Sequence, residues 1–380
     1  MAILISLLVL VAFFTSLFYW AFRNLPAEHW QIIAAVPFKR HDDGTWHGIN
    51  LTYYGFFNAS ACVFSCATVL MLMGSVNVPV AATLSITCLL LLICFPAAKI
   101  VARLVERKSS TFTVGGSSFV GILLLPWIIY AFNSFVGPRF NLTVPTTQML
   151  AAVAIAYAFG EAFGRLACIS FGCCYGKQVW QTPEVLQKIL RRFCFVFSGE
   201  TKKVAYEANL IGRPLVPIQA VTAIISTLAG LSGVYFFLQS RWITALLVPL
   251  IVTQIWRIVS ETLRADYRGG GRISTYQVMA TVAIAYSLAW MVFLDSAPGI
   301  SPIVVNGLRA VANTPVLLLL ELLWVLIFLY MGRSSVTAAR ISFHVVRERI
   351  CLTKCSGSNL ATVKSYVTGL GYVAQIRSKQ

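Results

Sequence analysis

The sequence contains little charge. Asp, Glu, Lys and Arg together make up 11% of its 380 residues, and 58% of the residues are hydrophobic. Soluble domains carry roughly 25% charged residues, so this composition excludes an ordinary soluble protein. Apolar runs long enough to cross a hydrocarbon layer of about 30 Å as helices recur along the whole chain. The composition therefore predicts an all-α integral membrane protein.

Nine hydrophobic runs have the length of a transmembrane helix. The first lacks the basic start and the small-residue cleavage site of a signal peptide, so we expect it to remain as a membrane helix. A polar stretch rich in Lys and Arg, 177–213, is expected to form a small basic head outside the membrane. The nine runs fall at about 1–21, 51–74, 77–98, 117–136, 146–171, 215–238, 242–260, 276–294 and 314–332.

Acidic residues are scarce as well: 13 Asp and Glu stand against 30 Lys and Arg, which gives a net charge of +17. No nucleic-acid-binding motif accompanies this charge, so we expect anionic lipid rather than nucleic acid as the partner. One set of loops carries 25 of the 30 basic residues, and the opposite set carries three, Arg139, Arg241 and Arg309. The positive-inside rule places the first set, which includes the head, in the cytoplasm.

Two of the basic residues, Arg165 and Arg257, lie inside apolar runs. A charge near the bilayer centre costs roughly 2.5–3.5 kcal/mol or more, so each needs a partner or a function. Glu161 precedes Arg165 by four residues and Glu261 follows Arg257 by four, which would place each pair on one helix face. Either the pairs only neutralise each other, or the guanidinium groups line a cavity and bind a phosphate. Two independent pairs favour the cavity.

Glycines and cysteines mark the same region. Gly160–Gly176 ends the fifth run with glycines where a helix would otherwise continue, and Gly115–Gly121 opens the fourth run. Glycine permits a ligand to approach the backbone closely. Cys168, Cys173 and Cys174 have no nearby histidine and no paired CxxC spacing, so we expect them to pack in the interior and predict no metal or other cofactor.

Five segments occur in an order that resembles the prolipoprotein diacylglyceryl transferases, over about residues 50–294. The longest reads Gly-Arg-Leu-Ala-Cys-Ile-Ser-Phe-Gly-Cys-Cys-Tyr-Gly. The five are Tyr53-Tyr-Gly55, Gly115–Gly121, Gly164–Gly176, Val216-Pro-Ile-Gln219 and Arg257–Arg264, the last followed by Asp266 and Gln277. The resemblance implies four parts: an added first helix and loop (1–50), the transferase-like domain (51–294), an added last helix (295–332) and a basic tail (333–380).

The resemblance also implies a function. This family transfers the diacylglyceryl group of phosphatidylglycerol to a cysteine thiol of a lipoprotein precursor, at the outer face of the plasma (inner) membrane. It implies Arg165 and Arg257 as a phosphate clamp, Glu261 as the group that orients Arg257, and Tyr54 as a donor to a lipid oxygen. The substrate-binding residues that it implies are Arg264, Glu161, Gly172, Gly176, Gly116 and Gln219.

Some positions differ from the family pattern, and they leave alternatives open. Val120 stands where the family has a histidine, Thr222 where it has a glutamate, and Cys173 lies in its central stretch. Either Glu161 or Glu261 would then act as the base, or the protein has kept the fold and binds anionic lipid without catalysis. A transporter of organic anions would use the same arginines, but the inverted repeat typical of that class is not evident.

Overall fold

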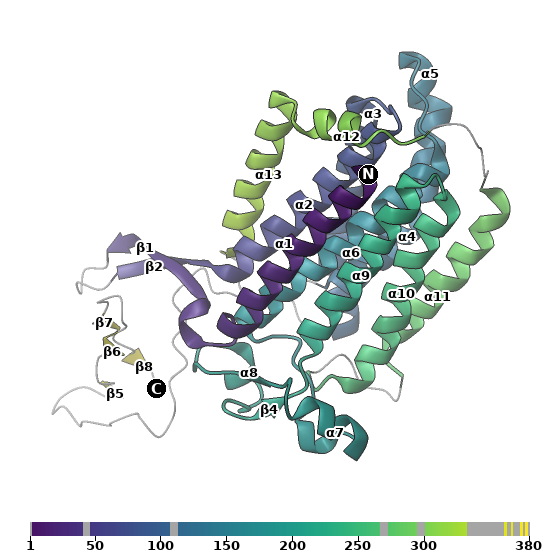
Figure 1. Cartoon of the computed structure of the whole chain (residues 1–380). Coiled ribbons are helices and arrows are strands. Elements are labelled where there is room, and N and C mark those ends of the chain that lie inside the picture. The colour runs from purple at the N-terminus through teal and green to yellow at the C-terminus, as the bar shows by residue number, and fades with distance from the viewer. Residues whose placement is uncertain are drawn as a thin grey trace.

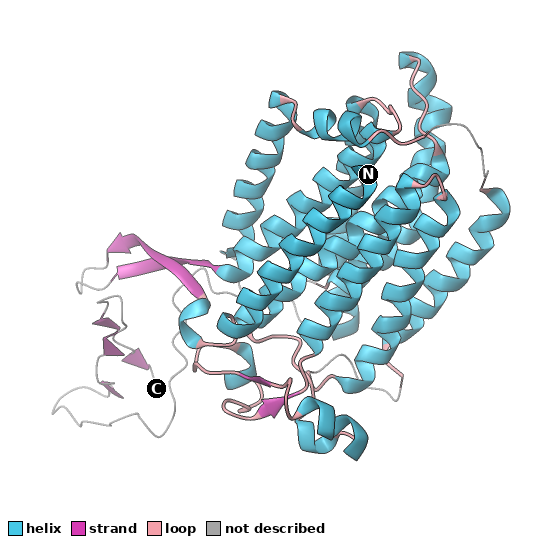
Figure 2. Ribbon diagram, in the orientation of Figure 1, coloured by secondary structure: helices cyan, strands magenta, loops and turns pink. Residues whose placement is uncertain are grey.

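The computed structural model describes residues 2–40, 46–106, 113–266, 273–294 and 301–332, and four two-residue strands at 361–362, 366–367, 373–374 and 377–378. Within this part of the chain, nine helices are long and apolar enough to cross a membrane, which confirms the predicted all-α multi-pass fold (Figures 1 and 2). They are α1 (Ala2–Asn24), α2 (Tyr53–Ser75), α3 (Val80–Glu106), α4 (Val114–Ala131), α6 (Thr146–Phe171), α9 (Ile218–Leu238), α10 (Trp242–Leu263), α11 (Thr275–Trp290) and α13 (Thr314–Gly332).

Helix α6 lies at the centre of the bundle and packs against α2, α9 and α10. It is the most buried of the spans, with 67% of its most apolar window inside the protein. Its alanines and glycines allow neighbouring backbones to approach closely, as is usual where membrane helices pack. At Gly160, for example, a Cβ atom would lie 2.4 Å from Ser65 Oγ of α2. The residues on this helix are therefore held by helices on several sides.

The other helices surround this core. Helices α3 and α4 pack together, α11 packs against α10 and α4, α1 against α9, and α13 against α2. Helix α4 continues through a π turn (Phe132–Val136) into the short α5 (Gly137–Phe140). After the undescribed residues 295–300, the short helix α12 (Val304–Val311) packs against α2 before α13 begins.

The elements outside the bundle gather mainly at one end, the end of α6 and α10 that carries their C-termini (Figure 1). The predicted head contains α7 (Glu184–Leu190), α8 (Lys203–Tyr206) and the strand pair β3 (Phe195–Val196) and β4 (Pro214–Leu215). Strands β1 (Ile32–Arg40) and β2 (Trp46–Thr52) form an antiparallel hairpin between α1 and α2 at the same end. The sequence did not predict this hairpin. We call this end of the bundle the head end.

A buried lysine ties the head to the bundle. Helix α6 ends at Gly172, which has a φ of 70°, and the Gly172 carbonyl accepts a hydrogen bond from Val204 N at 3.0 Å. Lys202 is fully buried beside this turn. Its Nζ donates to the carbonyls of Ser170 at 2.6 Å and of Leu25 at 3.0 Å. One side chain thus joins the ends of α1 and α6 to the loop that leads into α8.

This lysine predicts a pH-dependent stability. Burial lowers the pKa of Lys202 to about 7, and the charge of Glu28 offsets only part of that effect. The unfolded chain, with a lysine pKa near its usual value of about 10.4, then binds more protons than the folded protein between these values. The stability should therefore rise by on the order of 1–3 kcal/mol between about pH 7 and 9.5, and Lys202→Met should remove most of this rise.

Thermal unfolding of the detergent-solubilised protein at several pH values measures this effect. The matched control is Lys203→Met. Burial alone would lower the pKa of Lys203, but Cys173 and Glu207, the latter at 3.5 Å, outweigh it, so this pKa is raised rather than lowered. A lysine whose pKa is raised in the folded protein does not change the free energy of unfolding with pH below about pH 9.5. This control should therefore keep the rise in stability seen in the wild type. An identical pH dependence in wild type and Lys202→Met would contradict the prediction.

Candidate active site

A cavity of about 410 Å³ lies among α2, α3, α4, α6, α10 and α11. This volume is in the range of small-molecule sites. The described residues of its walls include four cations and three carboxylates, so together they hold one excess positive charge if all are ionised. The cations are Arg165, Lys203, Arg257 and Arg264, and the carboxylates are Glu161, Glu261 and Asp266. The two arginines that the sequence places at membrane depth therefore face the same space.

The cavity is charged at the head end and apolar further along the bundle. Its charged residues lie in the C-terminal halves of α6 and α10, just after the end of α10, and at the start of α8 in the head. On α10, Leu250 lines the cavity seven residues before Arg257, about 10 Å deeper along the helix. Val69 of α2 and Val153 of α6 line the same apolar part. A ligand with a charged group and an apolar body matches this division.

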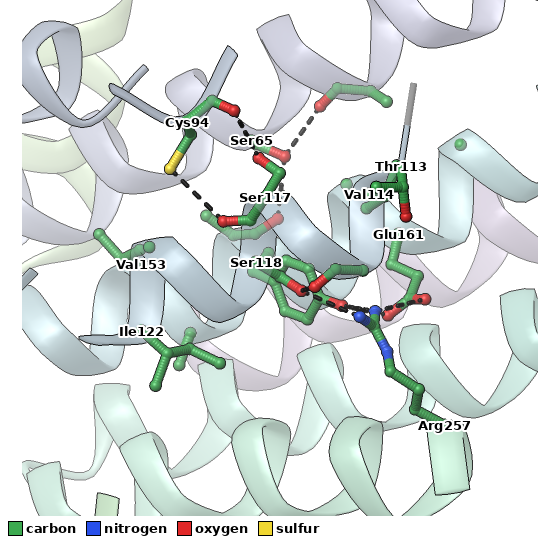
Figure 3. Close-up of a pocket in the computed structure, with 18 of the residues that line it drawn as sticks. Ser65, Cys94, Thr113, Val114, Ser117, Ser118, Ile122, Val153, Glu161 and Arg257 are labelled. Atoms are coloured by element: carbon green, nitrogen blue, oxygen red, sulfur yellow. Dashed lines mark hydrogen bonds and ion pairs between the residues drawn. The ribbon is translucent and has the colours of Figure 1, made fainter. Parts of the chain in front are cut away.

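Glu161 is the centre of the charged part. Its Oε1 accepts a hydrogen bond from Arg165 Nη2 at 2.6 Å and lies 3.2 Å from Arg257 Nη2. Its Oε2 accepts one from the Tyr157 hydroxyl at 2.6 Å. Arg257 also donates to the Tyr157 hydroxyl and, at 3.0 Å, to Ser118 Oγ of α4 (Figure 3). One carboxylate therefore serves two guanidinium groups and leaves one positive charge.

The sequence prediction for Arg257 was wrong in its partner. Glu261, four residues after Arg257, lies 3.8 Å from Arg264 Nη1 instead, and Arg257 turns across the bundle to Glu161. The i, i+4 spacing places two residues on one helix face but does not fix the side-chain rotamers. Here the stronger contact for Arg257 is the carboxylate of the neighbouring helix, whose side chain is only 4% exposed. The predicted Glu161–Arg165 pair is present.

Arg264 is held firmly just after the end of α10. Its Nε and Nη2 donate to the two carboxylate oxygens of Asp266 at 2.8 and 2.6 Å. Gly176 lies opposite Arg264 in a β-bridge, and a Cβ atom on Gly176 would lie 2.4 Å from the Val216 carbonyl oxygen. Arg264 thus lines the cavity with much of its guanidinium group already bound to carboxylates.

Arg165 has more hydrogen-bonding capacity left. Within the described part of the chain, only its Nη2 makes a hydrogen bond, although a guanidinium group carries five N–H donors. Two other cavity-lining atoms, Thr113 Oγ1 and Gln254 Nε2, are buried and make no hydrogen bond with the described residues. A buried polar atom without a partner costs about 1–3 kcal/mol. These groups are therefore suited to bind polar atoms of a ligand.

The predicted glycines and polar residues differ in their relation to the cavity. Gly115 lines it, and a Cβ atom there would lie 2.9 Å from Arg257 Nη1. The predicted Gly116 instead faces α3, where a Cβ atom would lie 2.4 Å from Val101 Cγ1. The predicted Gly172 and Gln219 lie behind the cavity wall. Gln219 donates to the Cys173 carbonyl at 2.9 Å and thereby supports the loop after α6.

Tyr54 lines the cavity from the first turn of α2, and its ring packs against Phe171 with centroids 5.4 Å apart. Sequence reasoning missed Tyr157, and within the segment Gly115–Gly121 it named Gly116 rather than Gly115 or Ser118. The signal for Tyr157 was present, because Tyr157, Glu161 and Arg165 follow one another at four-residue spacing on one helix face. The contact of Ser118 with Arg257 joins residues 139 positions apart and had no such signal.

Three cysteines lie together at the end of α6. The Sγ atoms of Cys168, Cys173 and Cys174 lie within 4.8 Å of one another, and those of Cys168 and Cys174 are 3.8 Å apart. All three residues line the cavity beside Arg165. Their irregular spacing in the sequence conceals this proximity, because the chain reverses direction after Gly172.

Comparison with known proteins agrees with this arrangement. A sequence model described as prolipoprotein diacylglyceryl transferase matches residues 45–293, which includes the cavity-lining parts of α2, α3, α4, α6, α10 and α11. A search among curated proteins returns no match. The family match covers more than half of the chain and includes all the charged residues that line the cavity in the described part of the chain. The protein therefore belongs to the prolipoprotein diacylglyceryl transferase family, whose members are membrane transferases of lipoprotein biosynthesis.

Proposed function

We propose that this protein transfers the diacylglyceryl group of phosphatidylglycerol to a cysteine thiol of a lipoprotein precursor, in the plasma (inner) membrane. The observation that carries the proposal is the division of the cavity into a cationic part at the head end and an apolar part along the bundle. A phospholipid has the same division. Its phosphate would meet Arg165 and Arg257, and its acyl chains would lie between α2, α6 and α10.

The reaction requires a phosphate leaving group. The thiol sulfur forms a bond to the glyceryl carbon that carries the phosphate ester, and the carbon–oxygen bond breaks. The electron pair leaves with glycerol phosphate, and the thiol proton leaves separately. Negative charge therefore builds up on the phosphate, where positioned cations stabilise the transition state. The excess positive charge that Glu161 leaves on Arg165 and Arg257 is equal and opposite to that of a phosphodiester.

The other residues of the site receive supporting roles in this proposal. Glu161 and Tyr157 hold the two guanidinium groups toward one point of the cavity. Tyr54, Thr113 and Gln254 are placed to bind lipid oxygens. Arg264, held by Asp266 and Glu261, adds positive potential at the head end. Gly172 and Gly176 shape the loop behind the wall, and Gln219 supports it.

We also propose that the segment 51–294 is the catalytic unit and that α1 and α13 are additions at its flanks. Helix α1 packs against α9, and α13 packs against α2 and contributes Ile327 and Met331 to the cavity wall. Residues 295–332 and 1–50 would then stabilise the bundle, and 333–380 would form a basic tail.

A second candidate function is binding of anionic lipid without transfer. It is favoured by the composition of the cavity wall: none of the described residues that line the cavity is a histidine, and Glu161 is occupied by two arginines. In this case the same arginines would bind the phosphate, and no product would form. The two functions therefore differ in turnover and agree in lipid binding.

Replacing an arginine of the clamp tests the proposal. Arg165→Ala and Arg257→Ala should each lower the transfer rate by about 10²–10³-fold, because each removes a cation at the leaving group. The measurement is the mass gain of a cysteine-containing precursor peptide incubated with the purified protein and phosphatidylglycerol vesicles. Arg241→Ala is the matched control, since Arg241 is exposed at the opposite end of α10.

Two results would contradict this prediction. If both variants transfer at the rate of Arg241→Ala, the arginines do not bind the reacting phosphate. If the wild-type protein produces no mass gain beside an active family member but binds phosphatidylglycerol, the second candidate function replaces the first. Thermal unfolding of each variant separates loss of the site from loss of the fold.

Removing the shared carboxylate gives a second prediction. Glu161→Gln leaves two buried guanidinium groups without a counter-charge and should destabilise the lipid-free protein by about 3–5 kcal/mol. Phosphatidylglycerol supplies a negative charge at the same place, so it should raise the unfolding temperature more in Glu161→Gln than in the wild type.

The matched control is Glu184→Gln, which changes an exposed glutamate of the head. It should leave both the unfolding temperature and the lipid effect as in the wild type. An equal lipid effect in wild type and Glu161→Gln would show that the phosphate binds elsewhere.

A further inference from the structure

The proposed reaction needs a group that removes the acceptor's thiol proton. The carboxylates that line the cavity are Glu161, Glu261 and Asp266, and each lies within 3.8 Å of an arginine nitrogen. Each of these carboxylates is thus already engaged by an arginine. None of the described lining residues is a histidine. The cavity thus has cations for the leaving group but, among the described residues, no evident base for the thiol.

The cysteine cluster offers a different way to form a thiolate. Zinc binds cysteine sulfur at about 2.3 Å in tetrahedral geometry, which places two such sulfurs about 3.8 Å apart. The Sγ atoms of Cys168 and Cys174 are 3.8 Å apart, and all three sulfurs lie within 4.8 Å of one another. A side-chain rotation that moves the third sulfur by about 1 Å would bring it to the same separation. Three sulfurs therefore stand close to three corners of a zinc tetrahedron.

The backbone holds this arrangement. Gly172 ends α6 with a φ of 70°, and Cys173 N donates to the Cys168 carbonyl at 3.1 Å. Cys174 has a φ of 56°, which is uncommon for a residue other than glycine. Gln219, fully buried, donates to the Cys173 carbonyl at 2.9 Å. The turn brings Cys173 and Cys174 back over the last turn of α6, onto Cys168.

The surroundings suit a negatively charged metal site. Three thiolates and one divalent zinc ion carry a net charge of −1. Arg165 lies close enough to Cys168 and Cys174 to interact electrostatically, Lys203 to Cys173 and Cys174, and Arg264 to Cys174. All three cysteines line the lipid cavity, so a fourth ligand can reach the cluster from there. Catalytic zinc sites keep such a fourth position open.

We propose that Cys168, Cys173 and Cys174 bind a zinc ion whose fourth ligand is the thiol of the lipoprotein precursor. This inference rests on the proposed transfer reaction. A coordinated thiol is deprotonated outright, so its proton passes to water when it binds. The thiolate then attacks the glyceryl carbon, the carbon–oxygen bond breaks, and glycerol phosphate leaves with the electron pair. The product is a thioether, which is uncharged and dissociates from the metal.

Binding of cobalt(II) alone tests the site without reference to activity. The full-length protein, purified under reducing conditions and treated with a chelator, should bind one Co²⁺ per chain and show thiolate-to-metal charge-transfer absorption. Cys168→Ser, Cys173→Ser and Cys174→Ser should each weaken binding by more than about 100-fold, since even outer-shell changes cost about 10–100-fold in affinity. Cys66→Ser and Cys94→Ser are matched controls, because these cysteines line the cavity outside the cluster.

The cobalt absorption spectrum also tests the fourth coordination position of the metal. A precursor peptide with cysteine should shift the cobalt spectrum, and the same peptide with serine should not. Thermal unfolding shows whether each serine variant still folds, and a variant that unfolds is replaced by the corresponding alanine variant. A peptide-dependent shift in the wild type, absent from a folded cluster variant, supports the proposal.

Two results would overturn the proposal. They are failure of the wild type to bind Co²⁺, and equal binding by the cluster variants and the controls. Transfer activity that persists after chelation and in the serine variants would show that the metal has no role in the reaction, and the proposed function would still stand. Cobalt binding without any transfer would have the opposite meaning, because the site would exist and the proposed function would fail.

Discussion

The arrangement of the bundle interior depends on one carboxylate that holds two guanidinium groups inside the membrane. Charges at this depth are expensive, and two arginines on neighbouring helices would repel each other without Glu161 between them. Glu161 can serve both only because α6 is the central helix, with α10 packed directly against it. The excess positive charge that remains distinguishes this cluster from a neutral structural ion pair, and it gives the cavity a preference for anions.

The position of the cluster along the helices matters as much as its charge. Arg165 and Arg257 lie toward the head end of their helices, while the same helices line the cavity with apolar residues further along the bundle. The function that we propose would place the phosphate of a lipid near the charged part and its acyl chains along the apolar part. The head, tied to α1 and α6 by Lys202, lies at the same end (Figure 1) and contributes Lys203 to the cavity wall.

The loop after α6 brings two kinds of chemistry together. Arg165 and Cys168 are one helical turn apart, so a phosphate bound to the arginine would lie beside the sulfur cluster. In the reaction that we propose, the arginines act on the leaving group and the cysteines on the nucleophile. The positions at which this chain differs from its family pattern, Val120, Thr222 and Cys173, would then reflect a different way of removing one proton. In this proposal Arg165 and Arg257 remain as the cations for the phosphate.

The sequence by itself determined the class of the protein. Runs of about 20 apolar residues predict membrane helices because only a helix satisfies its own backbone in lipid, and nine such helices are present in the described residues. The Glu161–Arg165 pair and the family resemblance could also be predicted from the sequence, because each depends on residues close together in the chain.

The tertiary structure alone decided that Arg257 pairs with Glu161 rather than Glu261, that Gly115 rather than Gly116 faces the cavity, and that three unevenly spaced cysteines meet. Such contacts depend on how each helix is rotated about its axis and where the chain turns between helices, and local spacing carries no information about either.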